Sequence, residues 1–211
     1  MKRVINLDNW NRKEHFKFFS ALDDPFWGIT MTVDFTSIYQ QSKNMEVSFF
    51  LYSVHFLLKC INATTAFKLR IENGEVVEYD KINISPTMGR EDGTFGFGFF
   101  EYDTDLSLFI ENAEKEIHRV KNSTGLSFSK DTARADVIRY SALPWFAFSE
   151  MKHAGSIQTG DSIPKISIGK LIQEKKKLLL PISISVHHGL VDGRNVAEFI
   201  QNVKDGQNNT L

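Results

Sequence analysis

The chain has 211 residues, 42% of them hydrophobic and 12% aromatic, and a formal net charge of −1. This length suits one domain or two small ones, and 18 phenylalanines exclude a disordered chain. The balanced charge argues against a nucleic-acid footprint and against a polybasic membrane anchor.

The sequence shows no sign of a signal peptide, a membrane span or a disulfide framework. The basic start, Met1–Asn6, lacks the apolar stretch of a signal peptide, and no segment approaches the roughly 18 apolar residues of a membrane span. Cys60 is the only cysteine and lies in an apolar helical pattern, so we expect it to be buried and inert. We therefore expect a cytoplasmic α+β domain.

Periodicity predicts the elements of the first half of the chain. A helix is expected over residues 10–16 after the possible cap Asp8-Asn9, and a strand with one buried face over residues 27–35. Ser48 is a possible cap for a helix through residue 61, whose apolar face must lie against a sheet. Asn73-Gly74 is the strongest hairpin signal, because both turn positions favour positive φ.

The second half follows the same logic. Asp92-Gly93 separates strands over residues 82–88 and 94–100, and glycines between the aromatic residues of the latter indicate close approach of a ligand or another backbone. The other expected elements are a helix at 106–120, a loop at 123–132, strands at 137–148, 163–168 and 177–186, and a closing helix at 196–203. The last strand is almost continuously apolar, which is typical of strands covered on both faces.

The predicted fold class is α+β, with a large mixed β-sheet flanked by helices. Composition does not shift along the chain, and no linker is long enough to divide it. We therefore expect a single domain over residues 1–211.

Two adjacent histidines follow the last strand. His187 and His188 precede Gly189-Leu190-Val191-Asp192-Gly193. An imidazole at a strand end, with a pKa near neutral, suits general-base catalysis, and a carboxylate four residues later can orient it or brace the loop. The alternative is a pair of polar residues that only ends a strand. Three other histidines lack partners at metal-ligand spacing and suit surface or core-rim positions: His15, His55 and His118.

Residues 187–193 form the pattern His-His-x-x-x-Asp-Gly, which several CoA- and carrier-dependent acyltransferases share. Condensation domains and plant CoA acyltransferases carry two such halves in one long chain, and acyltransferases of 2-oxo acid dehydrogenase complexes carry lipoyl domains and linkers. A chain of this length resembles the chloramphenicol acetyltransferases. Four stretches carry the resemblance in the family's order: Leu7–Phe16, Ser141–Trp145, Pro164–Lys170 and Leu178–Pro181.

The resemblance implies the catalytic residues. His188, the second histidine of the pair, would take a proton from an acceptor hydroxyl that attacks the thioester of acetyl-CoA, the co-substrate, with no metal involved. Ser141 would donate a hydrogen bond to the oxyanion, and Ser167 would hold a bound water near the intermediate. Asp192 would form an ion pair with Arg12 and brace the loop.

The resemblance also implies an assembly and a CoA site. Members of the family are homotrimers with active sites between subunits, so His188 would face a pocket built largely by the neighbouring chain. Lys170 is a candidate phosphate contact for CoA, or alternatively a solvated lysine, and Trp145 is a second candidate for the CoA side.

The acceptor pocket departs from the family's pattern. Its expected residues are Phe18, Phe19, Phe95, Phe97, Arg139, Met151, His153, Lys165 and Ser167. Phe19 replaces a usual tyrosine and Phe97 a small residue. The family's pocket is polar-neutral or apolar at the positions of Arg139, Met151, His153 and Lys165. These side chains would crowd a neutral aryl drug and favour an anionic or more polar acceptor.

Three functions therefore remain open. The first is an acetyl-CoA-dependent O-acetyltransferase acting on chloramphenicol, as an antibiotic-resistance enzyme would. The second is an O-acetyltransferase of the same fold that acts on a different hydroxyl acceptor. The third is a trimeric binding protein that keeps the fold without catalysis, against which the intact His188, Asp192, Arg12 and Ser141 argue.

Overall fold

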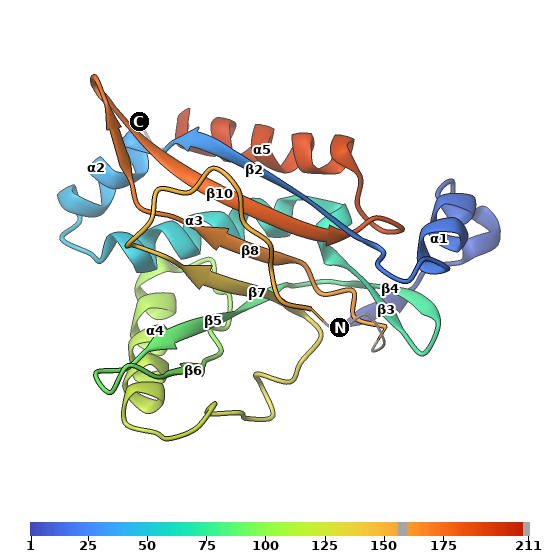
Figure 1. Ribbon diagram of the computed structural model, residues 1–211, viewed down its shortest axis with the longest axis horizontal. Coiled ribbons are helices and arrows are strands. Elements are labelled where there is room, and N and C mark those ends of the chain that lie inside the picture. The colour runs from blue at the N-terminus through green and yellow to red at the C-terminus, as the bar shows by residue number, and fades with distance from the viewer. Residues whose placement is uncertain (156–159, 209–211) are drawn as a thin grey trace.

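A mixed β-sheet with helices packed on one face forms the body of the molecule (Figure 1). The computed structural model describes residues 1–155 and 160–208. The seven-stranded sheet has the order β2-β10-β8-β7-β5-β6, with β9 paired to β10. Neighbours β5 and β7, and β7 and β8, run parallel, and the other pairs are antiparallel. Its strands are β2 (Phe26–Asp34), β5 (Asn83–Gly89), β6 (Phe95–Phe97), β7 (Val137–Ala142), β8 (Lys165–Ile168), β9 (Ile172–Glu174) and β10 (Lys177–His187).

A second, three-stranded sheet with the order β1-β4-β3 lies at one end of the molecule (Figure 1). Its strands are β1 (Lys2–Val4), β3 (Leu69–Glu72) and β4 (Glu75–Tyr79). The helices are α1 (Lys13–Ser20), α2 (Thr36–Asn44), α3 (Phe49–Ala63), α4 (Leu106–Lys121), α5 (Gly193–Asn208) and the short 3-10 turns η1 (Leu7–Asn9) and η2 (Thr65–Lys68). Among the described residues, no helix combines the length and apolar character needed to cross a membrane.

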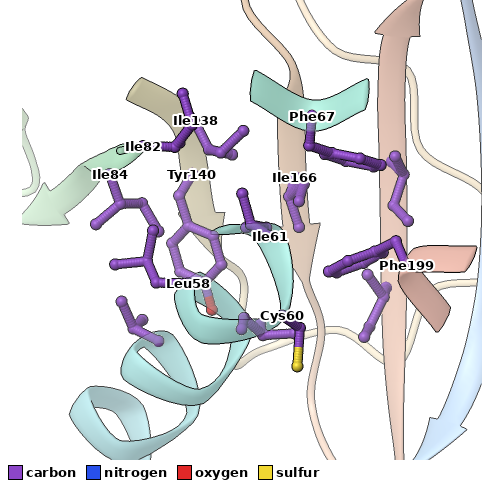
Figure 2. Packing of buried hydrophobic residues seen from close by; sticks show 14 of the residues in the cluster. Leu58, Cys60, Ile61, Phe67, Ile82, Ile84, Ile138, Tyr140, Ile166 and Phe199 are labelled. Atoms are coloured by element: carbon purple, nitrogen blue, oxygen red, sulfur yellow. The ribbon is translucent and has the colours of Figure 1, made fainter. Parts of the chain in front are cut away.

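The core lies between the sheet and α3, with α5 beside it (Figure 2). Helix α3 buries nine side chains, which is why its sequence is apolar on most of its surface. Tyr140 of β7 and Ile166 of β8 face it from the sheet (Figure 2). Cys60 is 3% exposed, and burial raises the pKa of its thiol to about 12, so the expectation of an inert cysteine is confirmed.

Several local predictions are confirmed. Asn73 and Gly74 adopt φ of 50° and 82° in the β3–β4 hairpin, and Gly93 adopts 80° in the turn between β5 and β6. Helices α4 and α5 cover the two predicted segments, and Leu180–Ile184 of β10 are buried on both faces of the sheet. Ser48 occupies the N-cap position of α3, although its side chain makes no capping hydrogen bond.

The first helix begins later than predicted. Asn6 caps η1 by accepting a hydrogen bond from the Asp8 amide at 2.9 Å, and Trp10 has an extended backbone that separates η1 from α1. Helix α1 therefore starts at Lys13, and Asp8-Asn9 is not its cap. The predicted segment, residues 10–16, therefore covers only the first half of α1 and the link before it.

Two predicted strands are too long. Strand β7 ends at Ala142, because the chain turns at Leu143, whose carbonyl accepts from the Phe146 amide at 3.2 Å, and Pro144 has no N–H for a ladder. Strand β6 covers only Phe95–Phe97. The glycines of this segment do mark a close approach, but by side chains of the chain itself. A Cβ on Gly98 would lie 2.0 Å from Cε of Met88.

Strand β2 is less buried than its alternation predicts. Val33 is 5% exposed, whereas Ile29 on the same side of the strand is 41% exposed. Strand β2 is the edge strand of the sheet and has a neighbouring strand on one side only, so part of its apolar face remains exposed.

A buried arginine joins the small sheet to the strand that carries Ser141. Arg70 in β3 is fully buried and donates hydrogen bonds to the carbonyls of Phe67, Leu69, Ala135 and Val137 at 2.6–2.9 Å. Burial lowers its pKa to about 10, so the guanidinium stays charged at neutral pH. The carbonyls of Ala135 and Val137 lie just before and at the first residue of β7, so Arg70 ties the start of that strand to β3.

We expect Arg70→Met to lower the free energy of unfolding by at least about 3 kcal/mol, because four carbonyls, three of them in buried hydrogen bonds, would lose the donor Arg70. Urea unfolding followed by circular dichroism measures this. Arg3→Met, which removes an arginine with a 72% exposed side chain, serves as the control and should change little. Equal effects of the two substitutions would contradict the role given to Arg70.

Candidate active site

The two adjacent histidines have different surroundings. His187 is the last residue of β10, is 3% exposed, and its Nδ1 accepts a hydrogen bond from the Gly189 amide at 3.2 Å. Its ring proton therefore lies on Nε2. Burial lowers the pKa of His187 to about 4, so this side chain is uncharged at neutral pH. A Cβ on Gly189 would lie 3.0 Å from the His187 ring, which explains the glycine at this position.

His188 follows the end of the strand and lies between two aromatic rings. Its ring stacks on Phe19 of α1 with centroids 3.9 Å apart, and the ring of Trp27 lies 5.4 Å away. The His188 amide donates to the Pro25 carbonyl at 2.8 Å. Its Nδ1 is buried without a hydrogen-bond partner among the described residues, while the side chain as a whole is half-buried.

Arg12 and Asp192 form an ion pair below the His188 loop. A terminal nitrogen of Arg12 contacts Oδ2 of Asp192, and the other donates to the His188 carbonyl at 3.3 Å. Asp192 Oδ1 also accepts from the amides of Arg194 and Asn195 at 2.9 and 3.2 Å, so Asp192 caps α5. The predicted pair is therefore present, but its side chains are 17% and 32% exposed and not fully buried.

The pKa of Asp192 reflects these contacts. Partial burial alone would raise the pKa, but the hydrogen bond from Arg12 and those from the Asn195 and Arg194 amides outweigh it. The pKa of Asp192 therefore lies below the usual aspartate value, and the carboxylate is ionised at neutral pH.

Five hydroxyl side chains cross the other face of the sheet in one row. We call this row, Thr30, Ser183, Ser167, Ser141 and Thr87, the hydroxyl row. The ladder registers pair Ser183 with both Thr30 and Ser167, and Ser167 with Ser141. Because their neighbours in sequence form the core, these hydroxyls point to the face opposite the helices, which we call the outer face.

Residues 151–153, which lie between β7 and β8, contact part of the hydroxyl row. His153 Nε2 and Ser167 Oγ are 2.9 Å apart, and Ser183 Oγ donates to the Met151 carbonyl at 3.5 Å. Ser141 is half-buried, and its Oγ lies 3.3 Å from Oγ1 of Thr87. Sequence reasoning identified Ser141, Ser167, Met151 and His153, but missed Thr30, Thr87 and Ser183. The polar residues that interrupt the apolar run of β10 were the available signal.

The remaining predicted residues lie around these two groups. Phe18 contacts Phe19 at a centroid distance of 5.2 Å, and Phe97 pairs with Thr87 in the ladder and stacks on Phe128. Phe95 is 47% and Trp145 71% exposed. Lys170 is exposed, and its amide donates to the Phe146 carbonyl at 2.7 Å, next to Trp145.

A cavity of about 970 Å³ opens on the outer face over β2, β10 and β8. Its wall includes His187, Trp27, Met151, His153 and Lys165. His188 is not part of this wall, although its neighbours Pro25, Trp27 and His187 are. The cavity therefore begins beside the candidate base and extends toward the hydroxyl row.

The candidate base and the candidate oxyanion donor do not meet within one chain. His188 lies five residues beyond Ser183 on β10, which corresponds to about 17 Å along a strand, and Ser141 lies two strands away, about 10 Å across the sheet. His188 with Arg12, Asp192 and Phe19 thus forms one group of residues, and the hydroxyl row forms a second, separate group.

Comparison with known proteins identifies the family. A model of the family described as "Chloramphenicol acetyltransferase" matches residues 2–204. This chain belongs to the chloramphenicol acetyltransferase family. Chloramphenicol acetyltransferase 3 of Escherichia coli is 27% identical over 208 residues, which cover 98% of this chain and 97% of that protein. A chloramphenicol acetyltransferase of Clostridioides difficile is 27% identical over 95% of this chain and 93% of its own.

Solved structures confirm the predicted fold. A chloramphenicol acetyltransferase superposes with a TM-score of 0.89 at 29% identity, covering 98% of this chain and 99% of that one. A probable dihydrolipoamide acetyltransferase from Listeria monocytogenes shares the fold, with a TM-score of 0.69 at 13% identity over 99% of this chain and 94% of its own. The chain is therefore an acyltransferase with the CoA-dependent acyltransferase fold, and the chloramphenicol acetyltransferase family uses acetyl-CoA as co-substrate.

The Arg12–Asp192 pair makes a prediction about stability. We expect Asp192→Asn to lower the free energy of unfolding by about 1–3 kcal/mol at pH 7, between the values for surface and buried pairs because the pair is partly exposed. The asparagine retains the cap of α5, so the loss reports the ion pair. Thermal unfolding of both proteins measures it, with Glu111→Gln in an exposed helical pair as a control that should be neutral.

The same pair predicts a pH dependence. Because the folded-state pKa of Asp192 is depressed, its contribution is present above the unfolded value of about 3.9 and is lost as the pH falls through the folded pKa. The stability difference between the wild type and Asp192→Asn should therefore be constant from pH 7 to pH 5 and shrink below about pH 4. A difference that grows on acidification would contradict this assignment.

Proposed function

We propose that this chain is an acetyl-CoA-dependent O-acetyltransferase in which His188 deprotonates an acceptor hydroxyl and a second subunit completes each active site. The observation that carries the proposal is the separation of His188 from Ser141 within one chain. We propose that the group around His188 supplies the base and the hydroxyl row supplies the oxyanion donor, so that neither group alone is a complete site. A heterologous contact between copies would bring the two together.

The proposed reaction proceeds by direct transfer. His188 takes the proton of the acceptor hydroxyl through Nε2, while the hydroxyl oxygen attacks the thioester carbonyl of acetyl-CoA. Ser141 of the neighbouring subunit donates a hydrogen bond to the oxyanion of the tetrahedral intermediate. The Thr87 hydroxyl donates a hydrogen bond to Ser141 and so leaves the Ser141 proton for the oxyanion. Collapse of the intermediate expels CoA as a thiolate, which takes up the proton from His188. Arg12 and Asp192 position the His188 loop and take no proton.

Features of the surface support assembly into a homotrimer. Strand β2 is an edge strand with exposed Ile29, and large apolar side chains are exposed on α1 and on the segments around residues 128 and 145. Their exposed fractions are 65% for Phe18, 70% for Phe128, 71% for Trp145 and 60% for Phe146. Trp145 and Lys170 lie close together on this surface, and we propose that they contact CoA.

The acceptor is a separate question. The names of the relatives make chloramphenicol the first acceptor to test. A different hydroxyl acceptor is favoured by one observation, the charged and polar wall that Lys165, His153 and Asp161 give to the cavity.

We expect His188→Ala to lower kcat by about 10²–10⁴-fold, because it removes the general base, and to leave the Kd for CoA nearly unchanged. Free-thiol release with a panel of hydroxyl acceptors measures kcat, and calorimetry measures the Kd. His187→Ala should act mainly on thermal stability. An inactive His187 variant with an active His188 variant would reverse the assignment, and absence of CoA binding in the wild type would favour a binding protein.

Mixed oligomers test the shared site. His188→Ala and Ser141→Ala chains are each expected to be impaired, the latter by about 10²–10³-fold. When the two are co-expressed in equal amounts, about a quarter of the sites in random trimers combine an intact His188 with an intact Ser141, so about a quarter of wild-type activity should return. Light scattering checks the trimer. No recovery in a mixed assembly, or full activity in a monomer, would exclude the shared site.

A further inference from the structure

Three charged side chains meet at the wall of the cavity. Arg139 Nη1 lies 2.5 Å from Oδ2 of Asp161, and Lys165 Nζ lies 3.5 Å from the same oxygen. Asp161 Oδ1 accepts from the Ile163 amide at 3.0 Å. Two cations therefore share one carboxylate, and the cluster keeps one positive charge.

The surplus charge belongs to Lys165. The contact of Arg139 with Asp161 is short, whereas 3.5 Å exceeds the 2.7–2.9 Å typical of a charge-assisted hydrogen bond. Lys165 is 6% exposed, and its ammonium lies 4.2 Å from the centre of the Phe26 ring. A Cβ on Gly155 would lie 3.0 Å from Nζ, so the chain at Gly155 is fitted closely to the ammonium. An incompletely paired cation is costly to bury, and a bound anion would offset that cost.

Lys165 faces a space that can hold such an anion. Lys165 and Asp161 both line the cavity, and Ser185 lies opposite Lys165 in the ladder and lines it as well. Gly28, opposite Ser185 on the other side, contributes no side chain and leaves room above the strand. The aromatic ring on the same side of the strand is that of Phe26, whose partner in the ladder is His187.

The other titratable groups of the wall do not cancel this charge. His187 is uncharged, because burial lowers its pKa to about 4. Burial, and next to it the positive charge of Lys165, lower the pKa of His153. The carboxylates of Asp24 and Glu150, like the ammonium of Lys152, belong to exposed residues of the wall, where water and salt screen them.

We propose that the acceptor of this enzyme carries an anionic group, a carboxylate or a phosphate, that pairs with Lys165, on an apolar body that packs against Phe26. The inference rests on the proposed acetyl transfer to a hydroxyl and adds the charge class of the acceptor. It gives Lys165 the role of a specificity-determining residue.

A matched set of aryl alcohols tests the charge class. Benzyl alcohol, 4-(hydroxymethyl)benzoate and 4-(hydroxymethyl)phenyl phosphate share the reacting hydroxyl and the ring, and chloramphenicol serves as a neutral reference. In free-thiol release assays, kcat/KM of the wild type should be about tenfold or more higher for at least one anionic member than for benzyl alcohol. The better of the two identifies carboxylate or phosphate as the preferred group.

Variants of Lys165 separate charge from structure. Lys165→Met should lower kcat/KM for the anionic member about 10- to 100-fold, mainly through KM, and leave the neutral member unchanged or improved. Lys165→Arg should retain the preference. Lys152→Met removes the same charge from the exposed rim and should have a much smaller effect on the anionic member.

The outcomes distinguish this inference from the proposed function. Acetylation of neutral acceptors at least as fast as of anionic ones would overturn the inference and leave the transferase intact. An equal loss for both members in Lys165→Met would make Lys165 structural, which also overturns it. If no acceptor releases thiol, the proposed function fails, and calorimetric titration of the aryl set into the His188→Ala protein still measures whether binding of the anion depends on Lys165.

Discussion

The pairing of β10 with β2 and β8 is the constraint on which the rest of the structure depends. This strand has 11 residues. It contributes Ser183 to the hydroxyl row and ends at His187, directly before His188. Its register sets Ser183 against both Thr30 and Ser167 and sets His187 against Phe26. Because the rise per residue of a paired strand is nearly constant, the five residues from Ser183 to His188 fix the distance between the hydroxyl row and the proposed base. A shift of one residue would exchange the core and outer faces of the whole strand.

His187 and His188 have different surroundings because the β10 ladder stops between them. His187 still follows the alternation of β10, faces the outer side, and is held neutral by burial. His188 is the first residue beyond the paired segment, so its ring is free to lie between Phe19 and Trp27 while its carbonyl meets Arg12. The Arg12–Asp192 pair joins α1 to the start of α5 and thereby holds both ends of the loop.

The outer face is polar, although much of it is buried. Ser167 and Ser183 are 0% and 2% exposed, which would be unfavourable without hydrogen-bond partners. His153 and the Met151 carbonyl supply these partners from the segment between β7 and β8. The same segment carries Asp161, which holds Lys165 and Arg139. The segment between β7 and β8 therefore both satisfies the hydroxyl row and sets the charge of the cavity.

The sequence alone determined the local elements and their faces. Alternation and apolar periodicity located the hairpin at Asn73-Gly74, helix α3 and the doubly covered β10, because these signals arise from residues close together in the chain. The motif at residues 187–193 and the family's segments predicted roles for His188 and Ser141, and they predicted the pairing of Arg12 with Asp192, 180 positions apart, which the structure contains. Only the tertiary structure decided which residues from distant parts of the chain are neighbours. The hydroxyl row, the sharing of Asp161 between two cations and the separation of His188 from Ser141 depend on which strands are neighbours and in which register. Periodicity reports that a face is buried, but inter-strand hydrogen bonds between distant segments choose the neighbour.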